Sequence, residues 1–303
     1  MAADPGAALA TRARAKVNLT LDVLGRRADG YHELHSLVAF AATGDLLTLV
    51  PEQHLSLTID GPEAAGLAPG RDNLVLRAAL ALAAETGPLR WGAFHLVKRL
   101  PVASGIGGGS ADAAAALRLL ARANAIASDD PALLRVAAAI GADVSVCLAS
   151  RARLMAGIGE RLGPPLRLPP LFALLVNPHV PVETAAVFRA LGLQPGQAVE
   201  AGPAGLGHAA AASAAAEAPT AAELLRRLAD SGNALEAPAM RVAPVIASVL
   251  SQLRALPECR LARMSGSGAT CFALFDDCRA SAAAGRALKS LRPDWWIKPT
   301  LLR

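Results

Sequence analysis

A glycine-rich stretch, "PVASGIGGGSADAAAAL" (residues 101–117), has the composition of an anion-binding loop. It follows a short β-like segment at 93–100 and leads into a helix that we expect from about Ser110 to Ala125. Glycines allow the backbone to approach a ligand closely, and a helix N-terminus offers N–H groups and a partial positive charge. The pattern therefore predicts the binding of a small anion. The alternative is a plain turn in which Ser110 or Asp112 caps the helix.

Two common nucleotide-binding loops do not fit this stretch. A Walker A loop ends in a lysine followed by serine or threonine, and no lysine follows these glycines. The dinucleotide fingerprint needs a third glycine where Ser110 stands. A phosphate loop at this position must therefore belong to another class.

Further candidate residues lie near the start and the middle of the chain. Segment 13–38, "ARAKVNLTLDVLGRRADGYHELHSLV", begins as a predicted strand and gathers four polar side chains: Lys16, Asn18, Tyr31 and His32. Taken alone, this pattern also fits a solvated hairpin that turns at residues 29–30. The segment "GADVSV" (141–146) carries Asp143, which by itself is more typical of a turn or a helix cap.

Composition narrows the classes of function. The chain has 303 residues, 53% hydrophobic and 18% charged, with a net charge of +5, which suits two domains and an anionic ligand. It has one tyrosine and no run of five like charges, which argues against a nucleic-acid platform. No apolar run approaches the roughly 20 residues of a membrane span, and no signal peptide is evident, so we expect a cytoplasmic protein without a membrane partner. Four cysteines without regular spacing are expected to be small, buried apolar side chains in a reducing compartment: Cys147, Cys259, Cys271 and Cys278.

The predicted elements form an α+β chain. Strands are expected at 171–178, 261–265, 271–276 and 295–299, at 93–100, and as a pair within 45–60 joined at 51–53. Helices are expected at 73–86, 110–125, 129–141, 183–191, 220–229 and 243–255, with one more before the last strand. The Ala/Gly-rich stretch 196–219 is expected to be a surface insertion or a loosely packed helix. The composition shifts at Gly163–Pro165, which we take as the domain boundary.

Three segments together resemble the motifs of the GHMP kinases. "PVASGIGGGSADAA" is similar to the second motif of that family, "AKVNLTLDVLGRRADGYHEL" to the first, and "ARMSGSGATCFALF" (262–275) to the third. They occur in the family's order and span most of the chain. The resemblance implies a two-domain GHMP kinase fold, with the active site in the cleft between the domains. Residues 1–163 would form an ATP-binding domain like ribosomal S5 domain 2, and residues 164–303 a ferredoxin-like domain that contributes to the substrate site.

The "ADGYH" element resembles one group within this family, whose acceptor is 4-diphosphocytidyl-2-C-methyl-D-erythritol. The implied reaction transfers the γ-phosphoryl group of ATP to the 2-hydroxyl of that compound, in the non-mevalonate route to isoprenoid precursors. A homoserine or mevalonate type of GHMP kinase is the alternative, although a small acid substrate does not require recognition of a base. A non-catalytic nucleic-acid binder is a third hypothesis, suggested by the basic charge and the S5-like domain.

The resemblance also implies roles for individual residues. Asp143 is the expected base and Lys16 the cation beside it. The expected ATP contacts are Gly105, Gly107, Gly108, Gly109 and Ser110 at the triphosphate, with Ser104, Lys98 and Asn73 on the adenine side. The expected substrate contacts are Asn18, Tyr31, His32, Thr184 and Phe188, the last of which, without the motif, would be an ordinary core residue.

Two further glycines, Gly266 and Gly268, are expected to shape the pocket. Mg²⁺ is expected with ATP, with no protein ligand assigned, and the protein is expected to be a monomer or a weak homodimer. Two positions depart from the family pattern: Ser145 stands in place of a common proline, and Asp112 stands where some relatives have asparagine.

Overall fold

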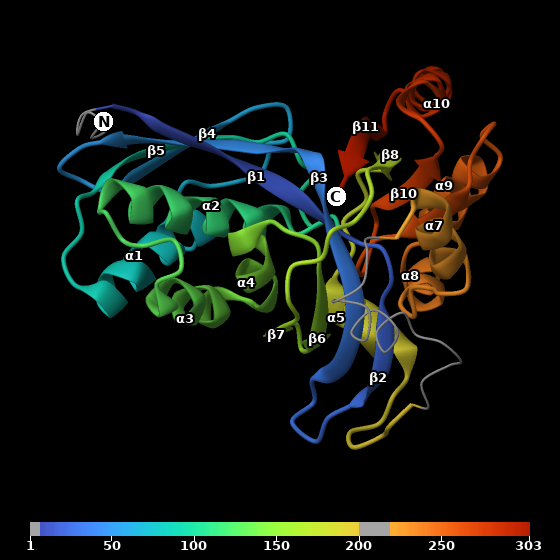
Figure 1. Ribbon diagram of the computed structural model, residues 1–303, viewed down its shortest axis with the longest axis horizontal. Coiled ribbons are helices and arrows are strands. Elements are labelled where there is room, and N and C mark those ends of the chain that lie inside the picture. Colours follow the sequence, from blue (N-terminus) through green and yellow to red (C-terminus); the bar gives the residue numbers. More distant parts are fainter. Residues whose placement is uncertain (1–6, 200–218) are drawn as a thin grey trace. The chain divides into compact units, whose positions relative to one another are not determined.

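The computed structural model describes residues 7–199 and 219–303 (Figure 1). Apart from its first four residues and its last, the Ala/Gly-rich stretch 196–219 lies outside the described residues, and its expected form stays a prediction.

Strands and helices alternate irregularly along the chain, which confirms the α+β class. The strands are β1 (Leu9–Asn18), β2 (Asp22–Arg26), β3 (His32–Pro51), β4 (Ser56–Asp60), β5 (Gly92–Val97), β6 (Arg153–Gly157), β7 (Arg161–Leu162), β8 (Leu171–Asn177), β9 (Leu261–Met264), β10 (Cys271–Phe275) and β11 (Trp296–Leu302). The helices are α1 (Leu74–Thr86), α2 (Gly108–Ala123), α3 (Pro131–Ile140), α4 (Ala142–Ala149), α5 (Thr184–Leu191), α7 (Ala221–Ala229), α8 (Glu236–Val242), α9 (Val245–Arg254) and α10 (Cys278–Leu291).

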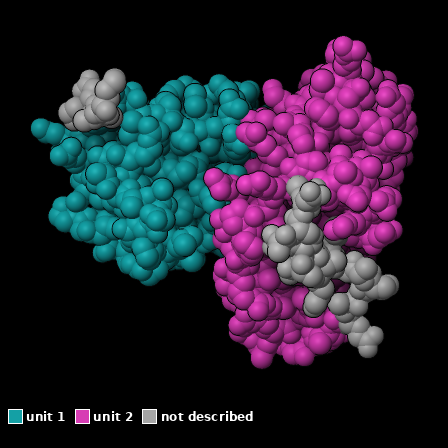
Figure 2. Space-filling view, in the orientation of Figure 1, with its two compact units in different colours: residues 1–15, 44–102, 107–150 teal, residues 16–43, 103–106, 151–303 magenta. Residues whose placement is uncertain are grey.

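The chain forms two compact units (Figure 2). Unit 1 comprises residues 1–15, 44–102 and 107–150, and unit 2 comprises residues 16–43, 103–106 and 151–303. The long strand β3 belongs to both, and the glycine-rich stretch is also divided between them. The units therefore differ from the two predicted domains, which are continuous in sequence, and the domain boundary near residue 163 stays a prediction.

In unit 1, helices α1, α2, α3 and α4 lie on one face of a sheet (Figure 1). The second half of β3 pairs antiparallel with β5, and β5 pairs parallel with β4. Buried and half-buried residues alternate along β5, as expected for a strand with one covered face. The two strands predicted within 45–60 are present, but β5 lies between them, so they do not pair with each other.

Side-chain caps explain where the predicted helices of unit 1 begin. The Asn73 side chain accepts a hydrogen bond from the Val75 N–H at the start of α1. Asp130 does the same for α3, whose first residue is Pro131. Both starts follow the expected preferences. Helix α4 was not predicted, because Gly141 reads as a stop signal for α3 and is in fact also the residue from which α4 begins.

The sheet of unit 2 has the strand order β11–β8–β10–β9, with each neighbouring pair antiparallel. Helices connect β8 to β9, and α10 connects β10 to β11. This β-α-β-β-α-β order is that of a ferredoxin-like fold, as expected for the second half of the chain. Helices α9 and α10 pack on the sheet, and their apolar faces, including Ile246, Leu250 and Leu288, form the core with Leu174 and Val176.

One buried arginine ties β9 to the end of β1 and to α7 in unit 2. The Arg263 guanidinium donates hydrogen bonds to the carbonyl oxygens of Leu19 at 2.7 Å, Leu228 at 2.7 Å and Ser231 at 2.6 Å. Helix ends leave carbonyl groups without partners in the helix. Arg263 therefore supplies hydrogen-bond donors to the carbonyl groups at the C-terminal end of α7. It also holds the backbone in place just after Asn18.

Replacing this arginine should destabilise the protein. In Arg263→Met the three carbonyl groups lose a charged donor, and we expect the free energy of unfolding in urea to fall by about 2–4 kcal/mol. Arg260→Met is the matched control, because the Arg260 side chain is exposed and pairs with the exposed Asp276, so its loss should cost at most about 1 kcal/mol. Equal losses in the two variants would contradict the buried role of Arg263.

Candidate active site

The glycine loop enters α2 without a side-chain cap. Gly107 is the N-cap residue, in the left-handed region with φ 65°, and the helix begins at Gly108. Ser110 is therefore the third helical residue and Asp112 the fifth, so neither caps the helix, and the capping alternative is wrong. The N–H groups of this first turn point out of the helix start, where the helix dipole favours an anion.

The preceding part of the loop, in unit 2, packs on the third motif. A Cβ atom on Gly105 would lie 2.6 Å from the carbonyl oxygen of Ser265 and 2.7 Å from that of Gly268, and its φ is +74°. The Ser265 hydroxyl donates to the Gly105 carbonyl oxygen at 3.1 Å. A Cβ atom on Gly266 would approach the same oxygen to 2.8 Å. The two motifs are therefore in direct backbone contact, and this contact requires glycine.

Two asparagines that sequence reasoning missed hold the third motif in place. The Asn233 amide donates to the carbonyl oxygens of Met264 and Gly266, each at 2.8 Å. The Asn177 amide donates to the Thr270 hydroxyl at 2.9 Å. Neither asparagine belongs to a recognisable motif, because each acts on a loop that is distant in sequence.

The end of β1 brings the first motif to the same place. The Lys16 N–H donates to the Ile106 carbonyl oxygen at 2.9 Å, and the Asn18 N–H donates to the Ser265 hydroxyl at 3.1 Å. The Asn18 amide nitrogen donates to the Ser36 hydroxyl at 2.8 Å. Its Oδ1 atom is buried without a hydrogen-bond partner in the described part of the chain. The three motif segments thus meet within unit 2, and the Oδ1 atom of Asn18 is a hydrogen-bond acceptor without a donor from the described residues there.

A pocket of about 740 Å³ in unit 2 collects four of the five predicted substrate residues. Tyr31, His32, Thr184 and Phe188 all line it. The rings of His32 and Phe188 stack, with centroids 4.5 Å apart and planes inclined by 27°. Tyr31 is 61% exposed at the rim. The Thr184 hydroxyl lies 2.9 Å from that of Ser267, which links the pocket to the third motif.

The surroundings of His32 favour the neutral form of its ring. Burial lowers its pKa, and the positive charge of Arg26 lowers it further. Its Nε2 atom is buried and has no hydrogen-bond partner among the described residues. Arg26 itself donates to the carbonyl oxygens of Gly30 at 3.3 Å and Leu193 at 3.1 Å. Sequence reasoning missed Arg26, because a single arginine in a hairpin carries no distinctive signal.

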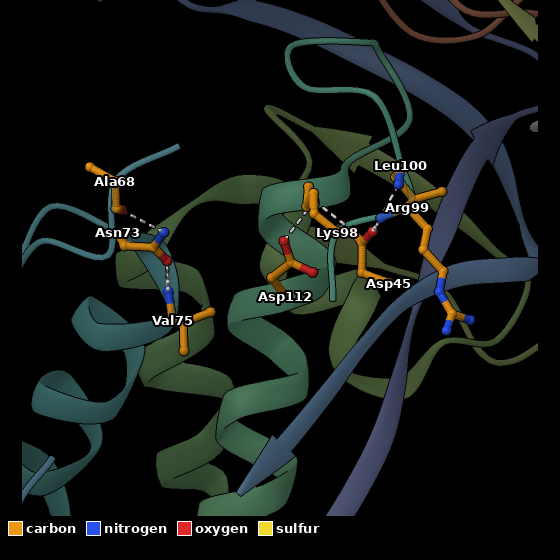
Figure 3. A network of polar contacts seen from close by, with 8 residues as sticks. All are labelled: Asp45, Ala68, Asn73, Val75, Lys98, Arg99, Leu100 and Asp112. Atoms are coloured by element: carbon orange, nitrogen blue, oxygen red, sulfur yellow. Dashed lines mark hydrogen bonds and ion pairs between the residues drawn. The ribbon is translucent and has the colours of Figure 1, made fainter. Parts of the chain in front are cut away.

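Two residues predicted to contact ATP, Lys98 and Asn73, are bonded to other residues of unit 1 (Figure 3). The buried Lys98 ammonium lies 2.5 Å from an Asp45 carboxylate oxygen and 2.8 Å from one of Asp112. Asn73 caps α1 with its Oδ1 atom and donates from its amide nitrogen to the Ala68 carbonyl oxygen at 3.3 Å. The contacts of Lys98 and Asn73 with ATP stay predictions. The ion pairs of Lys98 and the capping role of Asn73 were not predicted from the sequence.

Asp143 lies in the first turn of α4 and is partly exposed. A carboxylate in the first turn is stabilised by the helix N-terminus. Asp143 belongs to unit 1 and the buried Lys16 to unit 2. The catalytic pairing of these two residues stays a prediction.

Within residues 7–199 and 219–303, no three His, Cys, Asp or Glu side chains gather as a metal site. The same ranges contain no helix with the length and apolar character needed to span a membrane. None of the four cysteines is in a disulfide. Cys147 and Cys271 are buried as expected, Cys259 is half-buried, and Cys278 is exposed, contrary to expectation.

The contact between the second and third motifs can be tested at Gly105. In Gly105→Ala the new methyl group meets two carbonyl oxygens and the residue keeps a positive φ, so we expect a loss of about 2–4 kcal/mol in the free energy of unfolding. Gly66→Ala is the control, because its φ is +79° and nothing lies within 4 Å of the new Cβ atom. It should lose only about 1 kcal/mol. If chemical unfolding shows the same loss in both variants, the close packing is refuted.

The chain matches two family models, one in each half. Residues 73–151 match the GHMP kinases N terminal domain and residues 210–293 match the GHMP kinases C terminal model. These ranges together cover more than half of the chain.

Relatives match nearly the full length. A protein of Methylobacterium radiotolerans named 4-diphosphocytidyl-2-C-methyl-D-erythritol kinase is 60% identical, over 97% of this chain and 99% of the relative. One of Azorhizobium caulinodans with the same name is 55% identical, over the same shares. A crystal structure of a 4-(cytidine 5'-diphospho)-2C-methyl-D-erythritol kinase superposes with a TM-score of 0.75 at 34% identity, covering 97% of this chain and 99% of that one. Family models, relatives and structure agree, and the chain belongs to the GHMP kinases.

Proposed function

We propose that this kinase transfers the γ-phosphoryl group of ATP to the 2-hydroxyl of 4-diphosphocytidyl-2-C-methyl-D-erythritol, giving the 2-phosphate and ADP. The product belongs to the non-mevalonate route to isoprenoid precursors. The observation that carries this proposal is the unit 2 pocket, because it joins the "ADGYH" element to Thr184 and Phe188 around a stacked pair of flat rings. Relatives at 55–60% identity bear the name of this activity.

On the donor side, the N–H groups at the start of α2 bind the triphosphate. Gly107 to Ser110 supply these groups, and the lack of a side-chain cap leaves them available. Mg²⁺ accompanies ATP and offsets the charge of its phosphates when bound. No protein ligand is assigned to this ion, which in nucleotide sites usually keeps several waters and binds the substrate phosphates.

The acceptor is a tertiary alcohol, which is crowded and weakly acidic. Its oxygen attacks the γ-phosphorus, the bond from that phosphorus to the β–γ bridging oxygen breaks, and ADP leaves. Asp143 takes the hydroxyl proton as the new P–O bond forms. Lys16 offsets negative charge that builds on the transferred group.

The cytosine of the acceptor is recognised in the pocket. The Phe188 ring stacks on the base, an interaction worth about 1–3 kcal/mol per base in single-strand binders. His32, whose lowered pKa favours the neutral ring, offers its unpartnered Nε2 atom to the polar edge of the base. Asn18 and Thr184 contribute polar contacts, and the open Oδ1 atom of Asn18 can accept from a substrate hydroxyl.

A homoserine or mevalonate type of kinase is less favoured. A homoserine kinase structure from Cytophaga hutchinsonii superposes with a TM-score of 0.69 but at 19% identity, which is a likeness of fold alone. A small acid does not need a pocket with two stacked rings. Nucleic-acid binding has no comparable support. The cytoplasmic location and the monomeric or weakly dimeric state stay predictions.

The acceptor and the base can be tested together. With ATP and Mg²⁺, we expect ADP release with 4-diphosphocytidyl-2-C-methyl-D-erythritol and none above background with homoserine or mevalonate. Asp143→Ala should lower kcat by about a hundredfold or more, because the hydroxyl loses its proton acceptor. Turnover only with homoserine or mevalonate would refute the acceptor. Near-full turnover of Asp143→Ala would refute the base alone.

The stacking role of Phe188 predicts a selective effect. Phe188→Leu keeps the apolar bulk but not the flat face, so KM for the cytidylated acceptor should rise by about five- to a hundredfold while KM for ATP stays unchanged. Phe188→Tyr retains the ring and is the matched control, with a change of about twofold or less expected. A parallel rise of both KM values in Phe188→Leu would indicate a general defect of the fold and not loss of stacking.

A further inference from the structure

A buried cluster of three charges lies where β3, β5 and α2 meet in unit 1 (Figure 3). The Lys98 ammonium stands between the carboxylates of Asp45 and Asp112, and the three side chains are at most 5% exposed. The second oxygen of Asp45 accepts the N–H groups of Arg99 at 2.5 Å and Leu100 at 2.8 Å. Asp45 is therefore fully satisfied.

Asp112 is not satisfied in the same way. One of its oxygens accepts from Lys98, whereas Oδ1 is buried and lacks a hydrogen-bond partner within the described residues. Buried polar atoms are almost always paired, and an exception asks for an explanation. Nothing in the chemistry proposed above uses this carboxylate.

The cluster lies directly beneath the first turn of α2. A Cβ atom on Gly108 would lie 3.2 Å from the Lys98 ammonium nitrogen and 3.9 Å from an Asp45 oxygen. Asp112 follows Gly108 by four residues, which places it one helical turn below on the same face. The charge of the cluster is therefore felt at the N–H groups that are proposed to bind the triphosphate.

With both carboxylates ionised, the cluster carries one net negative charge. A buried negative charge beneath an anion-binding turn opposes binding, because water screens it poorly. A proton on Asp112 cancels that charge and leaves the Lys98–Asp45 pair intact. The charge state of one carboxyl group therefore acts on the donor site.

We propose that Asp112 is a positioning residue for the donor nucleotide: with Asp45 it holds the Lys98 ammonium beneath Gly108, and its own charge sets how tightly the loop binds ATP. The inference rests on the proposed function, since it takes the glycine loop to be the triphosphate site.

The electrostatics agree with this geometry. Burial raises the pKa of Asp112 to about 7, against the positive charge of Lys98 and with the help of the negative charge of Asp45. Helices α1, α3 and α4 pack on α2, and the charges that act on Asp112 are those of Lys98 and Asp45. As the pH rises through this range, the protonated, neutral form is lost, so ATP affinity should fall. By linkage, ATP binding should take up protons near neutral pH.

The test is the pH dependence of ATP binding without the acceptor. We expect the Kd for ATP, measured by calorimetry at fixed Mg²⁺, to rise by about three- to tenfold from about pH 6.5 to about pH 8.5. Asp112→Asn keeps the shape and an acceptor for Lys98 but cannot ionise, so its Kd should stay constant after the same correction for ATP's own ionisation. Equal pH dependence in both proteins would overturn the proposal.

A second variant separates charge from shape. Asp45→Asn removes the neighbouring negative charge, so Asp112 should ionise at lower pH, and the transition in Kd should move to lower pH instead of vanishing. An unmoved transition would overturn the proposal. Thermal unfolding checks that each variant is folded. ATP binding is measured without acceptor, so it does not depend on kinase activity. A wild-type protein that binds ATP but does not phosphorylate the acceptor would refute the proposed function. An identical pH profile of ATP binding in Asp112→Asn would refute the role of Asp112.

Discussion

The candidate site depends on a contact that only backbone atoms can make. Gly105 lies so close to Ser265 and Gly268 that a side chain on Gly105 would collide with the carbonyl oxygens of both residues. This contact joins the second and third motifs, and the N–H groups of Lys16 and Asn18 bring the first motif to the same point. Three segments distant in sequence thus share one junction, and their contacts there position the polar side chains of the motifs.

Unsatisfied polar atoms mark the places where ligands are expected. Four side chains of the described residues have a buried polar atom without a partner: Asn18, His32, Asp112 and Arg153. The first three lie in the first and second motifs. Because burying an unpaired polar group costs free energy, the occurrence of these atoms in the motifs is better explained by ligand binding or charge control than by chance.

Much of the local structure could be predicted, because caps and stop signals act over a few residues. Asn73 and Asp130 start helices where expected, and the order of strands and helices in the second half is that of a ferredoxin-like sheet. The failures are also local in origin. Gly141 ends one helix and begins another, and Ser110 lies inside a helix that an uncapped glycine begins.

By itself, the sequence determined the family and predicted the reaction and the residues of the site, because motif spacing and turn chemistry depend on neighbouring residues. Tertiary structure alone decided which side chains meet. Lys98 lies between two carboxylates, His32 stacks on Phe188, and Asn233 supports a loop about 30 residues away. These partners are far apart in the chain. The packing of β3, β5 and α2 brings the charges of the Lys98 cluster within a few ångströms of one another. The packing of α5 near the β2–β3 hairpin does the same for the rings of His32 and Phe188.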